Sequence, residues 1–179
     1  MLVEDSGGSG LDVATIEPQP GTYVLVLSAT TGGSVRIGRL GKLRLQPGFY
    51  VYVGSALGPG GVRARLAHHM KPSSRPHWHI DYLRKHTVLE EVWYCHGRTP
   101  REHRWARCLG TLPGASIPLA GFGASDCRCD SHLYFFRSRP SRNAFAQSLR
   151  VFRQHAGQLG LGNAGSQVGR WAENALDII

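Results

Sequence analysis

The chain has 179 residues, which is the length of one domain with a hydrophobic core and a small appendage. It carries 21 Lys and Arg against 12 Asp and Glu, a formal net charge of +9, and this excess favours an anionic partner, with nucleic acid first. A basic surface without a partner is the alternative. Only Lys42, Lys71 and Lys85 are lysines, so most of the positive charge belongs to arginine, which binds phosphate through a planar fork.

The sequence gives no sign of a membrane or secreted protein. No stretch approaches the ~18 apolar residues of a membrane span. The first 20 residues are acidic and glycine-rich, unlike a signal peptide. We therefore expect a cytoplasmic protein with no membrane partner. In a reducing compartment, the four cysteines are expected to be free thiols or metal ligands rather than disulfides. They are Cys95, Cys108, Cys127 and Cys129.

The first half of the chain predicts a small sheet. Residues 1–20 form a leader for which we expect no regular structure. Residues 21–28 (GTYVLVLS) are typical of a buried strand, and short alternating strands follow at residues 35–37 and 43–45. In the strand at residues 49–53, Phe and Val alternate with Tyr, which predicts one aliphatic face and one tyrosine face. Tyr23 and Tyr52 come close together if their strands pair with a common neighbour.

A basic helix follows this strand. Gly54 and Ser55 are expected to form a tight turn, and a glycine-rich loop leads to a helix over residues 62–70. Val62, Leu66 and Met70 lie four residues apart and predict its buried stripe. Arg65 lies at the edge of that stripe, from where it can lean towards Tyr52. A strand and a helix would thus deliver a tyrosine and an arginine to one place.

The second half alternates helices and strands. Helices are predicted at residues 77–85 and 101–110, strands at 88–95 and 133–137, and an irregular stretch at 112–130. Ser141 is a candidate N-cap for a helix that reaches residue 155, and a last helix is predicted over 167–176. The expected fold is α/β, with a small, mainly antiparallel sheet flanked by helices. The expected organisation is a leader at 1–20, a domain at 21–140 and a C-terminal helical extension at 141–179.

Five residues have side chains suited to phosphodiester chemistry. Cleavage needs a base for the nucleophile, a positive group for the developing charge and, in many enzymes, a metal held by a carboxylate. Tyrosine acts as a base only where a neighbouring cation lowers its pKa from ~10. A single glutamate is enough to hold Mg²⁺, which keeps several waters. The candidates are Tyr23, Tyr52, Arg65, His69 and Glu102.

Several motifs occur in a recognisable order: GTY at 21–23, YVGSA at 52–56, ARLAHH at 64–69 and a later helical Glu102. Together they resemble the GIY-YIG nuclease superfamily. The additional stretches HWHIDYL (77–83) and GFGASDCRCDSHLYFF (121–136) are similar to one uncharacterised branch, some of whose members are fused to endonuclease III-type DNA glycosylases. The resemblance covers residues 21–137 and implies a divalent-metal-dependent endonuclease that acts on nucleic acid, with DNA favoured over RNA.

The resemblance also implies roles for individual residues. Tyr23 and Tyr52 match the two motif tyrosines, one of which assists deprotonation of the attacking water. Arg65 matches the arginine that stabilises the transition state, and His69 a histidine common in the superfamily. Glu102 matches the glutamate that holds one Mg²⁺ or Mn²⁺. The expected contacts with nucleic acid are Gly54, Ser55, Arg63 and Lys71.

The sequence departs from the superfamily pattern in three places. Thr22 replaces the central residue of GIY, and the segment between Tyr23 and Tyr52 is longer than in typical members. An extra glycine loop precedes the basic helix, which leaves Arg63 as a rival to Arg65. A nucleic-acid-binding module that keeps the fold without turnover is therefore the alternative function.

Each candidate also has a structural interpretation. The tyrosines can simply pack over the sheet, the arginines can be solvated, and His69 can be a hydrogen-bonded neighbour of the site. Thr99 and Glu102 match a helix capping box with proline at the first helical position. Among residues 77–82, Trp78 and Tyr82 are expected in the core, with residues 79–81 orienting a neighbouring loop. The alternative is that His77, Trp78, His79 and Asp81 form a second polar wall of the site.

Cys127, Cys129 and His132 have the residue types of a zinc site. One intervening residue is tighter than the usual spacing, and a fourth ligand has to come from Cys95, His96 or Cys108. A packed, hydrogen-bonded turn is the favoured interpretation, and a zinc-stabilised interaction domain is a third possibility.

Overall fold

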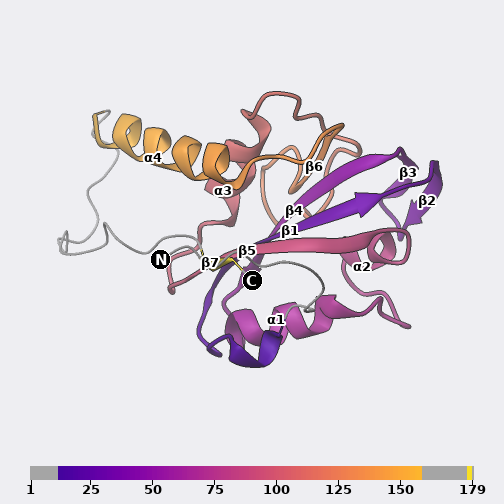
Figure 1. The fold of residues 1–179 in the computed structure, drawn as a ribbon, viewed down its shortest axis with the longest axis horizontal. Helices are drawn as coiled ribbons and strands as arrows, with labels where there is room; N and C mark the ends of the chain where they lie inside the picture. The colour runs from indigo at the N-terminus through magenta and orange to yellow at the C-terminus, as the bar shows by residue number, and fades with distance from the viewer. Residues whose placement is uncertain (1–11, 159–176, 179) are drawn as a thin grey trace, which may run out of the picture.

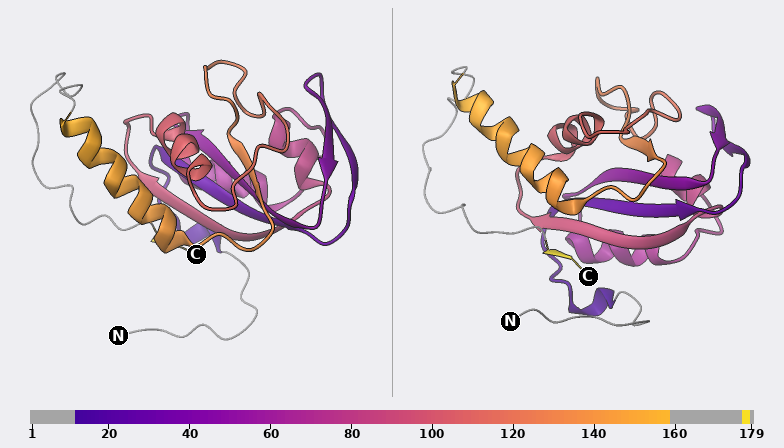
Figure 2. Two further views of the ribbon diagram at one scale, coloured as in Figure 1. Left: turned by 90° about the horizontal axis from the view of Figure 1, so that it is seen from above. Right: turned by 45° about the horizontal axis from the view of Figure 1, so that its top comes forward.

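The fold is a twisted antiparallel sheet with helices on both faces (Figure 1, Figure 2). The structure is a computed structural model that describes residues 12–158 and 177–178. Its main sheet has five strands in the order β6-β4-β1-β5-β7, and a separate two-stranded sheet contains β2 and β3. The predicted α/β class, the mainly antiparallel sheet and a helix after residue 141 are confirmed. None of the helices in the described ranges is long and apolar enough to cross a membrane.

The central strand is β1 (Gly21–Ala29), which is buried along its whole length except for the half-buried Ser28. It pairs antiparallel with β4 (Gly48–Ala56) on one side and with β5 (Val88–His96) on the other. The expectation that a common neighbour separates the two tyrosine strands is wrong. They pair directly, because the long segment between them folds away as a hairpin.

That hairpin is formed by β2 (Gly33–Ile37) and β3 (Gly41–Leu45). Buried and exposed residues alternate along both strands, as the period of a strand with one covered face requires. The buried set is Val35, Ile37, Leu43 and Leu45. The exposed positions between them include the cations Arg36, Lys42 and Arg44.

Two hydrophobic cores lie on the two faces of the main sheet. One core joins the tyrosine face of β4 to α1 (Gly61–Met70) and α2 (His79–Arg84). The other joins its Val51 and Val53 face to α3 (Glu102–Gly110) and α4 (Arg142–Gln158). The predicted division of the strand into an aliphatic and a tyrosine face is thus confirmed. Figure 1 shows α1 on one side of the sheet and α3 and α4 on the other.

The two ends of the chain differ in part from expectation. The leader is not wholly irregular, because η1 (Val13–Thr15) forms a 3₁₀ turn and Ile16 is buried in the core. At the other end, Ser141 Oγ accepts a hydrogen bond from the Ala144 N–H at 3.3 Å, as a cap does. The short strand β7 (Asp177–Ile178), which the sequence did not predict, pairs with β5. The predicted helix at 167–176 lies outside the described residues.

Gly54 and Ser55 do not form the predicted turn. Both continue β4, since the β1–β4 pairing extends to Thr22 opposite Ser55 and Gly21 opposite Ala56. Glycine followed by serine is a turn signal in isolation, but a full-length strand neighbour keeps the backbone extended here. The edge strand β6 (Leu133–Phe136) pairs with residues 49–52 of β4, and on its other side Phe135 forms an isolated bridge with Ser116.

The start of β1 gives a direct test of this packing. A Cβ at Gly21 would lie 2.2 Å from the Cys95 carbonyl oxygen and 2.6 Å from Val62 Cγ2, so strand or helix would have to move. We expect Gly21→Ala to lower the free energy of unfolding by about 1–3 kcal/mol, as overpacking of a core does. Urea denaturation measures this. At Gly33 no atom lies within 4 Å of an added Cβ, so Gly33→Ala should change stability by less than ~1 kcal/mol. Equal losses in both variants would contradict the packing described.

Candidate active site

A pocket of about 210 Å³ opens at the end of the sheet where β1 begins and β4 ends. It is bordered by two strands, by α1, by the N-terminal ends of α2 and α3, and by the loop that precedes β6. Six of the residues singled out from the sequence line it: Tyr23, Tyr52, Gly54, Ser55, Arg65 and Glu102. The folded chain therefore brings most of the predicted site together.

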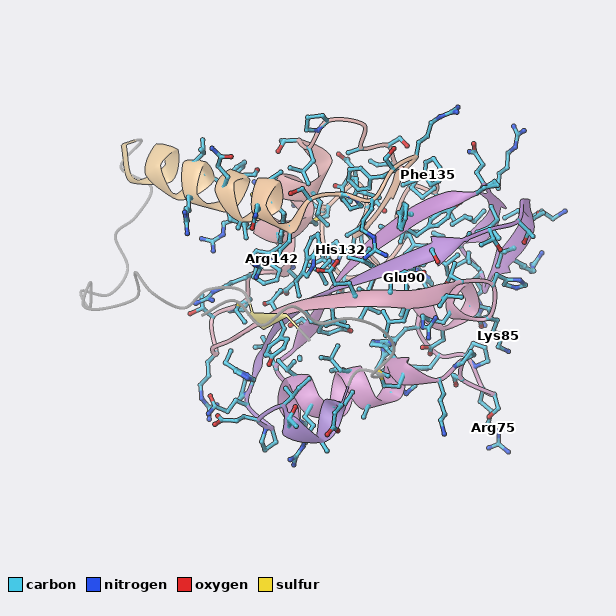
Figure 3. The ribbon with its side chains drawn as sticks, viewed as in Figure 1. Arg75, Lys85, Glu90, His132, Phe135 and Arg142 are labelled. Atoms are coloured by element: carbon cyan, nitrogen blue, oxygen red, sulfur yellow. The ribbon has the colours of Figure 1, made fainter. Side chains whose placement is uncertain are left out.

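The edge of the sheet explains how side chains from elements on its two faces can line one pocket. The ladder between β6 and β4 ends with the Val53 N–H, which donates to the His132 carbonyl at 2.9 Å. Beyond this point, β4 has no strand of the described sheet on its β6 side, so Gly54 and Ser55 border the pocket there. Figure 3 shows His132 in the interior, with Arg75 and Lys85 at the periphery. Residues from α1 and from α3 can therefore meet around the end of β6.

The Tyr23 ring packs over a glycine of the neighbouring strand. It lies opposite Gly54, where an added Cβ would come within 2.3 Å of the tyrosine ring. The Tyr23 hydroxyl is hydrogen-bonded to His69 Nε2 at 2.9 Å, and both side chains are buried. Burial raises the pKa of Tyr23 well above its ordinary value, and Tyr52 adds to this, while Arg65 acts against it. Tyr23 is therefore a protonated hydroxyl at neutral pH.

His69 is a neutral buried histidine. Burial lowers its pKa to about 3, and the neighbouring His68 adds to the effect. Its Nδ1 is buried and has no hydrogen-bond partner in the structure. The interpretation of His69 as a hydrogen-bonded neighbour of the site therefore fits its surroundings, because an imidazole with so low a pKa is a weak proton acceptor.

Tyr52 and Arg65 both line the pocket and interact electrostatically. Burial raises the pKa of Tyr52, and the positive charge of Arg65 acts in the opposite direction. The Arg65 guanidinium stacks on the Trp78 ring, with its central carbon 4.2 Å from the ring centroid. Such stacking fixes the orientation of a long side chain that would otherwise be mobile.

The other predicted cations lie elsewhere. Arg63 and Lys71 are both exposed and do not line the pocket. Arg63 lies on the same helix as Arg65, so the direction of the side chain, rather than the helix, separates the two arginines. Of the rival arginines, only Arg65 is placed to act at this pocket.

Asp81 fixes the backbone around Trp78 at the start of α2. Its carboxylate accepts hydrogen bonds from the backbone N–H groups of His77 and Trp78 and is paired with His68 Nε2 at 2.9 Å. Burial acts to raise the pKa of Asp81, but these three contacts outweigh it and lower the pKa below its ordinary value. A buried carboxylate of this kind fixes the N-terminal end of α2 and, with it, the indole under Arg65.

Trp78 has a second role besides the expected core packing, because it also lines the pocket. The expected orienting role of its neighbours is seen at His79, whose Nδ1 accepts the Gly123 N–H at 3.0 Å. Gly123 has a φ of +71°, and a Cβ there would lie 2.9 Å from Tyr52 Cε2. Glycine is thus required where the loop crosses the tyrosine.

Glu102 is the first residue of α3, and its side chain is only 13% exposed. The predicted capping box is wrong: the N-cap is Arg101, and no side chain caps this helix. Glu102 Oε1 lies 3.2 Å from His103 Nε2, while Oε2 is buried without a hydrogen-bond partner. A buried carboxylate oxygen is costly unless a donor or cation satisfies it. The residue therefore fits the ligand of a divalent cation.

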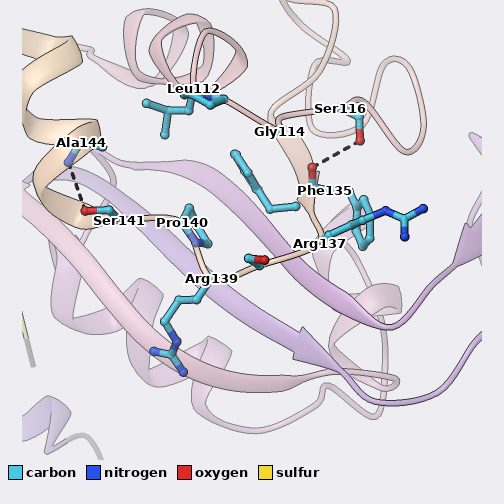
Figure 4. A pocket seen from close by; sticks show the side chains of 12 residues that line it. Leu112, Gly114, Ser116, Phe135, Arg137, Arg139, Pro140, Ser141 and Ala144 are labelled. Carbon is cyan, nitrogen blue, oxygen red and sulfur yellow. Dashed lines mark hydrogen bonds between the residues drawn. The ribbon is translucent and has the colours of Figure 1, made fainter.

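A different cavity of about 570 Å³ lies between β6 and the start of α4 (Figure 4). It contains Arg137 and Arg139, and Figure 4 shows the hydrogen bonds of Ser116 with the Phe135 carbonyl and of Ser141 with Ala144. No histidine, cysteine or carboxylate lines it. It therefore has neither a base nor a metal ligand, and the pocket around Tyr23 remains the candidate active site.

Comparison with known families adds one result. The model of a family described as domain of unknown function DUF123 matches residues 22–154. The chain belongs to this family. The match spans β1 to α4 and thus every residue of the pocket. Neither a curated protein nor a solved structure matches the chain.

Three polar residues of this DUF123 pocket were not placed there from the sequence: His103, Asp126 and His132. His132 was considered only for zinc, and the other two were not considered. No local pattern marks them. Trp78, for which the core was favoured over a second polar wall of the site, belongs to both.

The low pKa of His69 predicts how stability depends on pH. His69 takes up its proton near pH 6.5 in the unfolded chain but only near pH 3 in the folded chain. Its contribution to stability is therefore fully present above pH 6.5 and is lost as the pH falls towards 3. In this window the free energy of unfolding should fall more steeply in the wild type than in His69→Gln, by up to ~1.4 kcal/mol per pH unit. Urea titrations at several pH values measure both slopes. Parallel slopes would show that His69 titrates normally in the folded chain.

Proposed function

We propose that this DUF123 chain is a divalent-metal-dependent endonuclease of the GIY-YIG type that hydrolyses phosphodiester bonds in nucleic acid, with DNA favoured over RNA. One observation carries the proposal: Tyr23, Tyr52, Arg65 and Glu102, which come from four separate elements, line one pocket. The same four residues match the superfamily motifs in the sequence.

Arg65 is suited to bind the phosphate under attack. Its guanidinium is held on Trp78 and partly exposed towards the pocket, so it can offer a fork of donors to the equatorial oxygens. A preorganised cation of this kind stabilises the charge that develops as the nucleophile adds to phosphorus. Ser55, which is half-buried near the end of β4, borders the pocket beside it and can meet the backbone of the substrate.

Glu102 is suited to hold one Mg²⁺ or Mn²⁺ through its unpartnered Oε2. When bound, such an ion lowers the pKa of water and neutralises phosphate charge. Asp126 lines the same pocket and adds a second negative charge near this place. The two acidic residues balance the cationic side of the pocket around Arg65.

The tyrosines are suited to orient the attacking water. Their raised pKa values keep both hydroxyls protonated, so each can accept a hydrogen bond from water through its oxygen. The hydrogen bond with His69 fixes the direction of the Tyr23 hydroxyl. Because His69 is neutral, it leaves the positive charge of the pocket to Arg65.

The proposal predicts a clear result for two variants. Arg65→Ala and Glu102→Gln should each lower the rate of nucleic-acid cleavage by ~10²-fold or more, because each removes charge stabilisation in the transition state. Cleavage of labelled single-stranded, duplex, flapped and branched DNA and of RNA would be followed with Mg²⁺, with Mn²⁺ and with EDTA. Unchanged melting temperatures would show that both variants are folded.

Arg63→Ala is the matched control, since it removes an exposed arginine from the same helix. It should cleave at close to the wild-type rate. Near-normal rates in both Arg65→Ala and Glu102→Gln would sink the site assignment. Equal losses in Arg63→Ala and Arg65→Ala would assign the effect to the general charge of the helix.

The second candidate function is a nucleic-acid-binding module without turnover. It is favoured by the direction of the tyrosine pKa values, which are raised where a catalytic base needs them lowered. The exposed cations of the β2–β3 hairpin supply a binding surface. The turn of this hairpin lies against the loop that leads into β6, since an added Cβ at Gly121 would meet Leu40 at 3.3 Å.

Both functions predict salt-dependent binding through the hairpin. Replacing Arg36, Lys42 and Arg44 with alanine should weaken binding of a DNA duplex and flatten its salt dependence, by ~0.9 in the logarithmic slope for each phosphate that the hairpin no longer neutralises. Fluorescence anisotropy over a range of salt concentrations measures the slope. An unchanged slope would remove the hairpin from the interface. Binding without product at any divalent metal would favour the module over the enzyme.

A further inference from the structure

A second group of metal-binding side chains lies beside the pocket. Ligand atoms of His103, Cys127 and Cys129 all lie within 4.8 Å of one another. His132 adjoins the same group, since its Nε2 is 3.5 Å from Cys127 Sγ. His103 belongs to the first turn of α3, whereas the other three belong to the loop that leads into β6. The chain thus gathers two thiols and two imidazoles from separate segments.

The spacing of these groups is close to that of tetrahedral zinc. Zinc takes sulfur at ~2.3 Å and nitrogen at ~2.0–2.1 Å, so neighbouring donors around one ion are roughly 3.3–3.8 Å apart. The distance from Cys127 to His132 already falls in this interval. His103, Cys127 and Cys129 need to close by at most about 1 Å, which side-chain rotation of two cysteines on an irregular loop allows. His132 lies outside this group of three, so its ring has to turn further towards the other donors.

We propose that His103, Cys127, Cys129 and His132 bind one zinc ion. Four protein donors fill a tetrahedral shell and leave no open position, so the ion is structural. Its ligands are thiolates and imidazoles, which select zinc over Mg²⁺, whereas the carboxylate of Glu102 suits the harder ion. The proposed ion is distinct from the Mg²⁺ or Mn²⁺ proposed at Glu102, although His103 and His132 also line the candidate active-site pocket. The proposal does not depend on nuclease activity.

The structure offers a different residue as the fourth ligand from those considered from the sequence. Cys108 is buried in the α3–α4 core, and Cys95 Sγ accepts a hydrogen bond from Arg101 at 3.0 Å. Neither these cysteines nor His96 belongs to the donor group, and His103 takes the place assigned to them. The cysteine spacing that argued against zinc matters less once a second segment, α3, shares the coordination.

The proposed ion would fasten the loop to α3. Gly123 and Asp126 of this loop line the candidate active site, and Glu102 is the immediate neighbour of His103. Zinc-binding histidines commonly place their other ring nitrogen against a carboxylate. His103 Nε2 lies 3.2 Å from Glu102 Oε1, so in such an arrangement Nδ1 would be the nitrogen that binds the ion. A structural ion here would therefore hold in place one wall of the pocket.

The first experiment measures the metal itself. The full chain would be purified without a histidine tag and without chelator, and analysed for metals. We expect close to one zinc ion per chain. After removal of zinc, Co²⁺ should give the visible bands of a tetrahedral ion and a charge-transfer band from thiolate. Absence of zinc together with an octahedral Co²⁺ spectrum would overturn the proposal, and so would a mass two hydrogens lighter, which indicates a Cys127–Cys129 disulfide.

Matched variants assign the ligands. Cys127→Ser and His103→Gln should lose the bound zinc and the thiolate band, whereas Cys108→Ala and His86→Gln should keep both. His103 is 45% exposed, so its replacement leaves the fold intact even where a buried change does not. Zinc retained in both ligand variants, or lost equally in the controls, would contradict the assignment.

A third measurement reports on the loop without reference to activity. Arg128 lies between the two cysteines and is exposed, so trypsin can cleave after it when the loop opens. Zinc should slow this cleavage severalfold in the wild type and leave it unchanged in Cys127→Ser. Cleavage after Arg128 at the same rate with and without zinc would show that no ion fastens this loop.

Discussion

The direct antiparallel pairing of β1 with β4 is the constraint on which the rest of the site depends. Its register sets Tyr23 opposite Gly54, and the ring occupies the space that any other residue at that position would fill. The same pairing carries β4 past the end of its other neighbour, β6, and leaves its final residues at the border of a pocket. Helix α1 then packs on the tyrosine face through Val62 and Leu66, which brings Arg65 over the same place. A backbone ladder therefore fixes the positions of side chains that are far apart in the sequence.

Burial gives the pocket its electrostatic character. Tyr23, Tyr52 and His69 are all removed from water, so each is held in its neutral form at neutral pH. Two charged groups complete the pocket: Arg65 stacks on Trp78, and Glu102 keeps one buried carboxylate oxygen without a partner. A buried acceptor left unpaired lowers stability, and such a cost is usually found where a ligand is bound. The pocket thus combines neutral buried groups with one arginine and two acidic residues, Glu102 and Asp126, that can meet a substrate or an ion.

The loop between residues 121 and 132 connects the two proposed sites. Its glycine at 123 crosses Tyr52 and is anchored to α2 through His79, and its cysteines lie against His103 of α3. The loop has no helix or strand of its own, so hydrogen bonds and the proposed ion have to supply its order. Glu102 and His103 are adjacent on α3 and face the two sites together. A change in the loop would therefore affect both.

The sequence by itself determined the class of fold and most members of the pocket. Alternation in β4 predicted its two faces, because a strand buried on both sides needs apolar or aromatic residues on each. Repeating apolar positions predicted the helices, and the motif residues proved to share one pocket. Only the tertiary structure decided which strands pair, that Gly54 and Ser55 extend a strand instead of turning, that Glu102 faces the pocket instead of capping its helix, and that His103 meets the two cysteines. The physical reason is that local periodicity records which side of an element is buried, whereas pairing and side-chain contacts between distant segments depend on the packing of the whole chain.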